Sequence, residues 1–289
     1  MTATARTWSR RAGTALAVLG IAWVAMRFRR YGDALGPAAV PGVVWACAAG
    51  LAIVYAGADA LLALAWRALL HTQGTPAGRA WSLQTYGVSQ LSKYVPGNVM
   101  HLASRQLLGA SAGVPHATLA GSSLYELVGL ASAGLLLSLL ALPLIDGSRF
   151  RWVTPAAGAT IVLLALALVR MASGPLTARV LGYHLLFLLT ASLTFATPLA
   201  LLSPDAARTL PWAAACGAYA AAWLAGFLPP GAPAGLGVRE AVLVLLLGGH
   251  AAEQDLLPAV VLSRVVTALG DTLFFGAAVW MGRREPADG

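Results

Sequence analysis

Four basic and four acidic residues lie inside or beside strongly apolar segments. The basic residues are Lys93, Arg105, Arg239 and Arg264, and the acidic residues are Asp59, Glu126, Glu240 and Asp271. A lysine or arginine at the centre of a bilayer costs roughly 2.5–3.5 kcal/mol on insertion scales, so each charge needs a partner or a function. The eight groups could simply pair with one another. We expect a mixed arrangement, in which some pairs hold the protein together while one or two arginines face a cavity.

Two of these arginines follow a Pro-Gly break at the same spacing. In "KYVPGNVMHLASR" Arg105 is the eighth residue after Gly97, and in "PPGAPAGLGVRE" Arg239 is the eighth residue after Gly231. Each break lies between two apolar half-segments, in residues 80–111 and 211–249. The recurrence indicates an internal repeat.

Each half-segment is too short to cross a bilayer. About 15 residues at ~1.5 Å each reach only ~22 Å, against a hydrocarbon core of ~30 Å. We therefore predict two re-entrant helical hairpins, since irregular backbone at that depth survives only when it is buried in protein or lines a wet cavity. The residues expected at the hairpin tips are Pro96, Gly97, Pro230, Gly231, Gly235 and Gly237.

The second half-helix of each hairpin should begin near Asn98 and near Leu236. A helix N-terminus carries unsatisfied amides and the positive end of the helix dipole, so two such ends predict an anion site, and phosphate fits it. Asn98 adds a polar group beside the first tip, and His101 could shuttle protons near neutral pH or could simply be hydrogen-bonded. No residue is predicted to be catalytic and no cofactor is predicted.

The elements that must position these residues are long apolar helices. The chain has 289 residues, of which 58% are hydrophobic and 10% charged. Its apolar runs do not alternate as barrel strands do, which favours an all-α polytopic membrane protein. Six spanning helices are expected, at about 12–28, 41–66, 117–142, 152–170, 180–202 and 256–281. The first run has basic flanks but no cleavage site, so we expect a retained span and not a signal peptide.

Three predicted spans separate the hairpins, so the second should enter from the opposite side of the membrane. The chain, a single transmembrane domain over 1–289, then divides into inverted halves, 1–145 and 146–289, as in many secondary transporters. The distribution of arginines favours cytoplasmic termini in a multi-pass protein of the cell (inner or plasma) membrane, although Arg27, Arg29 and Arg30 favour the reverse.

Several other classes of function lack their motifs. The sequence contains no HExxH or P-loop pattern, the stretch "YGVSQL" is not a GxSxG motif, and the five histidines are scattered. Cys47 and Cys216 fall inside apolar segments, which favours neither a disulfide framework nor a metal site. The net charge of +8 comes from residues that flank or interrupt the spans, which argues against a nucleic-acid partner.

The stretches "LSKYVPGNVMHLASR" and "SSLYELVGL", followed later by "LPPGAPAGLGVREAVLVLLL" and "LSRVVTALGD", resemble the transmembrane region of the lysylphosphatidylglycerol synthase family, over nearly the whole chain. The resemblance implies a lipid-handling fold with two re-entrant elements. One departure is visible, since the usual "PGGLG" turn reads "PPGAPAGLG" here. The positions that match the family motif are Lys93, Tyr94, Pro96, Gly97, Arg105, Glu126, Gly235, Gly237, Arg239, Glu240 and Arg264.

The same resemblance implies that the aminoacyl-transfer domain of the full-length synthases is absent, because the chain ends at "RREPADG" soon after its last predicted span. Three hypotheses follow. The first is a flippase that moves an anionic or aminoacylated phospholipid, or a polyprenyl-phosphate lipid, between leaflets. The second is an accessory subunit that presents a lipid-linked substrate to a separate transferase. The third, a transferase with Glu126 or Glu240 as general base, lacks a donor-binding motif. Whether the protein forms a homo-oligomer stays open.

Overall fold

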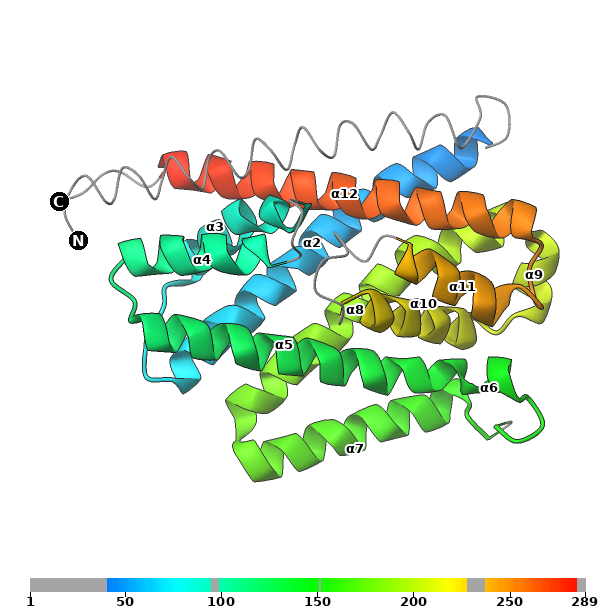
Figure 1. Cartoon of the computed structure of the whole chain (residues 1–289), viewed down its shortest axis with the longest axis horizontal. Helices are drawn as coiled ribbons and strands as arrows, with labels where there is room; N and C mark the ends of the chain where they lie inside the picture. Colours follow the sequence, from blue (N-terminus) through cyan, green and yellow to red (C-terminus); the bar gives the residue numbers. More distant parts are fainter. Residues whose placement is uncertain (1–40, 95–98, 151, 228–236, 285–289) are drawn as a thin grey trace.

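The computed structural model describes residues 41–94, 99–150, 152–227 and 237–284, and within these ranges it contains helices and loops but no strand (Figure 1). Five helices in this part are long and apolar enough to cross a bilayer. They are α2 (Gly42–Thr72), α5 (His116–Ser138) with its continuation through η2 (Leu139–Ala141) and α6 (Leu142–Ile145), α7 (Pro155–Ser173), α8 (Pro175–Leu202) and α12 (Glu253–Arg284). The protein is therefore an all-α membrane protein.

These five helices correspond to five of the six predicted spans, and the predicted span at 12–28 lies outside the described residues. The largest difference is at the end of α2, which continues past residue 66 to Thr72. Polar contacts support this extension: Arg67 Nε donates to the Ala77 carbonyl at 2.9 Å, and the Ala77 amide donates to His71 Nε2 at 3.0 Å. A span predicted from an apolar run misses such a helix end, because the run stops at the first basic residue, Arg67.

The long helices pack around α2 and α8, which lie along each other, while α12 packs on both and α5 packs on α8. Trp66 of α2 is completely buried, and its indole Nε1 donates to Ser122 Oγ of α5 at 3.0 Å. α7 packs mainly against α8, to which a single residue, Gly174, joins it. Gly174 has φ +87°, a conformation that glycine adopts without steric cost.

Four shorter segments form two packed pairs. The first pair is α3 (Arg79–Gln90), extended by the 3₁₀ turn η1 (Leu91–Tyr94), and α4 (Met100–Ser111); the second is α10 (Trp212–Phe227) and α11 (Val238–Leu247). A further short helix, α9 (Pro204–Thr209), precedes α10. Figure 1 shows α3 and α4 towards one end of the long helices, and α10 and α11 towards the other.

α4 and α11 both begin near the middle of the molecule and run outward in opposite directions, to their connections with α5 and α12 (Figure 1). Their starts, at Met100 and Val238, lie two residues beyond the predicted starts near Asn98 and Leu236. The helical pairs thus match the predicted half-helices of 80–111 and 211–249. Re-entry into the bilayer stays a prediction.

The first pair is held closely against α12. A Cβ atom at Gly87 of α3 would lie 2.5 Å from Ala278 Cβ and 3.4 Å from the Phe274 carbonyl oxygen, both in α12. Small residues allow this approach of two backbones, which is a common way to pack helices in membranes. The approach brings η1, with Lys93 and Tyr94, over α12.

Candidate functional site

The buried charges form three groups. The first, called the Asp271 cluster, comprises Asp59, Gln90, Lys93, Tyr94 and Asp271. The second, the Arg105 pair, comprises Arg105 and Glu126, and the third, the Arg264 pair, comprises Arg264 and Glu240. Each group joins a short helix or its 3₁₀ extension to a long helix.

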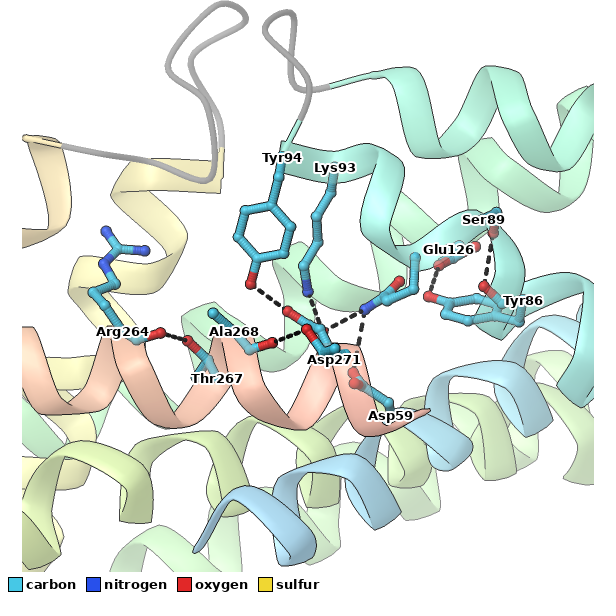
Figure 2. Close-up of polar contacts among 12 residues, drawn as sticks. Asp59, Tyr86, Ser89, Lys93, Tyr94, Glu126, Arg264, Thr267, Ala268 and Asp271 are labelled. Carbon is cyan, nitrogen blue, oxygen red and sulfur yellow. Dashed lines mark hydrogen bonds and ion pairs between the residues drawn. The ribbon is translucent and has the colours of Figure 1, made fainter. Parts of the chain in front are cut away.

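The Asp271 cluster ties η1 to α12, as Figure 2 shows. Lys93 Nζ donates to Asp271 Oδ1 at 2.7 Å, and the Tyr94 hydroxyl makes a short hydrogen bond to Asp271 Oδ2. Asp271 is 0% exposed, whereas the Lys93 side chain keeps 20% of its surface accessible. A buried carboxylate needs such donors because desolvation strongly disfavours an isolated charge.

Asp59 extends the cluster into α2. The side-chain amide of Gln90 lies between the two acids: its Nε2 is 3.2 Å from Asp59 Oδ1 and 3.4 Å from Asp271 Oδ1. Asp59 is 0% exposed, and its Oδ2 accepts no hydrogen bond from a donor among the described residues. The cluster thus contains two carboxyl groups and one lysine.

The Arg105 pair is enclosed. Arg105 of α4 and Glu126 of α5 are 1% and 2% exposed, and Arg105 Nη1 makes a short contact with Glu126 Oε2. The Tyr86 hydroxyl of α3 donates to Glu126 Oε1 at 2.7 Å, and the guanidinium lies 3.9 Å from the centre of the Tyr86 ring. Trp66 flanks the guanidinium at 5.6 Å. Stacking and ion pairing together suit a structural role.

The Arg264 pair joins α12 to the start of α11. Nε and Nη2 of Arg264 donate to Glu240 Oε1 at 3.0 and 2.8 Å, and the Gly237 amide donates to Glu240 Oε2 at 2.7 Å. Glu240 thereby satisfies one of the free amides at the start of α11. The helix dipole also stabilises its negative charge there. Gly237 has φ +83°, which suits glycine at this cap.

Of the four basic residues predicted for the site, Arg239 is the one without a carboxylate partner among the described residues. It is half-buried in the first turn of α11, its guanidinium lies 5.5 Å from the centre of the Trp223 ring, and its Nε finds no hydrogen-bond acceptor in the described ranges. Its neighbours Arg264 and Glu240 pair with each other. The three residues together therefore carry one positive charge in excess.

Most of the predicted site residues that the structure describes make polar contacts, in three separate groups. Lys93, Tyr94, Arg105, Glu126, Glu240, Arg264, Asp59 and Asp271 all make the contacts given above. His101 lies in the first turn of α4, where its Nδ1 has no partner among the described residues. The predicted residues Pro96, Gly97, Asn98, Pro230, Gly231 and Gly235 lie outside the described ranges.

The sequence analysis did not predict two residues that contact the Arg105 pair, Tyr86 and Trp66. Tyr86 lies on the same face of the first short helix as Ser82, Ser89 and Lys93, at the spacing of three or four residues that aligns side chains on a helix. This polar stripe in an apolar setting could have identified Tyr86. Trp66 gives no such signal, since an indole in an apolar helix is ordinary.

The two halves use opposite arrangements of charge. In the first half the short helix α4 carries the arginine and the following long helix α5 carries the glutamate, whereas in the second half α11 carries the glutamate and α12 the arginine. Arg239, which corresponds to Arg105 in the predicted repeat, therefore makes no such ion pair among the described residues.

No group of three or more histidine, cysteine, aspartate or glutamate side chains in the described ranges is arranged to hold a metal ion. Comparison with models of known families and with curated proteins finds no match to this chain.

Proposed function

We propose that the protein binds the anionic head group of a membrane lipid beside Arg239 and moves that lipid between the two leaflets. The observation that carries the proposal is the excess positive charge at the start of α11, where Arg264 pairs with Glu240 and Arg239 has no carboxylate partner among the described residues. The free amides of a helix N-terminus add to the attraction for an anion. A phosphate is the anion common to phospholipids and polyprenyl-phosphate lipids.

The surrounding groups support this assignment. Trp223 offers an aromatic face beside the Arg239 guanidinium, and the partly accessible Lys93 adds a second cation on the neighbouring hairpin. Arg264 and Asp271 lie on the same side of α12, facing the short helices (Figure 2). The resemblance of the hairpin sequences to the lysylphosphatidylglycerol synthase transmembrane region agrees with a lipid substrate. The Arg105 pair, which is closed, serves to hold α4 in place.

The test uses the purified full chain in liposomes with fluorescent phosphatidylglycerol, lysylphosphatidylglycerol or a polyprenyl phosphate in one leaflet. We expect accelerated exchange of at least one of them. Arg239→Gln should weaken head-group binding about tenfold to a hundredfold, since a hydrogen bond to a charged group contributes roughly 1.5–3 kcal/mol. Arg208→Gln is the matched control, because the Arg208 side chain is 79% exposed on α9.

Equal activity of Arg239→Gln, Arg208→Gln and the wild type would refute the site. Binding of a labelled lipid that depends on Arg239, without exchange between leaflets, would instead favour the accessory role, in which the protein presents a lipid-linked substrate to a separate transferase.

A further inference from the structure

The two acids of the Asp271 cluster contact the same side-chain amide. Gln90 Nε2 lies 3.2 Å from Asp59 Oδ1 and 3.4 Å from Asp271 Oδ1, and both acids are 0% exposed. Two carboxylates cannot hydrogen-bond, because each offers acceptors alone; a bond between them needs a proton. Asp59 Oδ2, which has no donor from another described residue, is the atom left for it.

The charge balance of the cluster leads to the same requirement. Lys93 compensates one carboxylate, at 2.7 Å from Asp271, and the remaining contacts come from the neutral Gln90 and Tyr94. With both acids ionised, one negative charge would stay buried without a counter-charge. In a low-dielectric interior such a group takes up a proton or a cation instead.

The other groups that face the pair do not supply the missing charge. Tyr55 of α2 and Tyr219 of α10 offer hydroxyl groups, which supply no positive charge. Glu126 of α5 is bonded to Arg105, and Arg264 of α12 is bonded to Glu240 of α11. Arg239 of α11 forms no ion pair with either acid within the described ranges. On α8, which packs on both α2 and α12, the imidazole of His184 lies against Gly129 of α5.

We infer that Asp59 and Asp271 share one proton and form a proton-binding site that fastens η1 and the α3–α4 pair to α12. Loss of the proton leaves two adjacent carboxylates, whose repulsion loosens the hold of Asp271 on Lys93 and Tyr94. Asp271 lies two turns from Arg264 on α12, so the same helix carries the proton site and part of the proposed anion site. The inference rests on the carboxyl pair and does not require that the ligand be a lipid.

The test is an infrared titration of the purified full chain in lipid nanodiscs, which follows the carbonyl stretch of protonated carboxyl groups as the pH rises. Exposed carboxyl groups lose their protons at a pH well below neutral and give no such band at pH 7. We expect one protonated carboxyl that persists above neutral pH and then titrates. A wild-type protein with no such band would overturn the inference, whatever the variants do.

Two variants test whether this carbonyl band comes from the Asp59–Asp271 pair. Asp59→Asn keeps the Lys93–Asp271 ion pair and a hydrogen bond across the pair, and it should abolish the band and flatten the pH dependence of thermal unfolding in the alkaline range. Asp205→Asn, at a side chain that is 95% exposed, is the control and should leave both unchanged. A band that survives Asp59→Asn would contradict the assignment. Loss of the wild-type band on adding sodium, but not choline, would support the site and show that sodium displaces the proton from it.

Discussion

Arg105 and Arg239 occupy equivalent positions in the predicted repeat but have different surroundings. Arg105 is buried between Glu126, Tyr86 and Trp66, which suits a structural role. Arg239 lies beside one aromatic ring and a second arginine, and we propose that its charge binds a ligand. The difference between the two arginines lies in the position of the nearest carboxylate, which a repeat in the sequence does not reveal.

At this scale we predict that Arg105→Ala destabilises the protein by about 3–5 kcal/mol, because it leaves Glu126 buried without a counter-charge. Thermal unfolding in detergent micelles measures the effect. The control Arg208→Ala should change stability by no more than ~0.5 kcal/mol, since that side chain is exposed.

The double variant Arg105→Met, Glu126→Gln should recover much of the loss, because it removes both charges together. A double variant as unstable as Arg105→Ala would show that stacking on Tyr86 and Trp66, and not the ion pair, holds α4.

Among the elements, the contact between α3 and α12 positions the Asp271 cluster. Gly87 permits the contact, and Gln90, Lys93 and Tyr94 follow on the next turns and reach Asp271. The backbone approach and the polar contacts thus depend on each other, since a displacement of α3 would move all three donors together.

We predict that Gly87→Ala weakens this arrangement. Its Cβ would lie 2.5 Å from Ala278 Cβ, an atom fixed to the backbone of α12, so the helices must separate, at a cost of about 1–3 kcal/mol. Gly276→Ala is the control on α12, where a Cβ meets no atom within 4 Å and a glycine-to-alanine change in a helix is neutral or stabilising. Thermal unfolding compares the two variants; equal melting temperatures would show that α3 does not rely on this approach.

The long helices could be predicted from the sequence, whereas the partners of the charges could not. Apolar runs fixed the positions of α2, α5, α7, α8 and α12, because length and hydropathy are local properties. Lys93 and Asp271 are 178 residues apart, and no local pattern relates them. Burial of charge identified both as members of a site, but their pairing follows from the packing of α3 on α12.

For the whole molecule, the arrangement of the hairpins predicts opposite accessibility of their open ends. Three long helices, α5, α7 and α8, separate the α4–α5 loop from the α10–α11 pair, so the two loops should lie on opposite sides of the membrane. In a background without Cys47 and Cys216, Ala112→Cys should react with an impermeant maleimide from the cytoplasmic side and Gly249→Cys from the outer side. Both positions are exposed.

Labelling of Ala112→Cys and Gly249→Cys from the same side would exclude inverted halves. Labelling from opposite sides but in the reverse sense would keep the inverted halves and reverse the orientation of the termini.

α7 differs from the other long helices in having no buried residue, and it packs mainly on α8. None of the residues of the candidate site lies on it. We therefore expect selection to preserve the hydrophobicity and the length of α7 more than the identity of any one of its side chains. Among related chains, this helix should be the long helix whose sequence drifts fastest, while the faces of α2, α3 and α12 that meet at Asp271 change least.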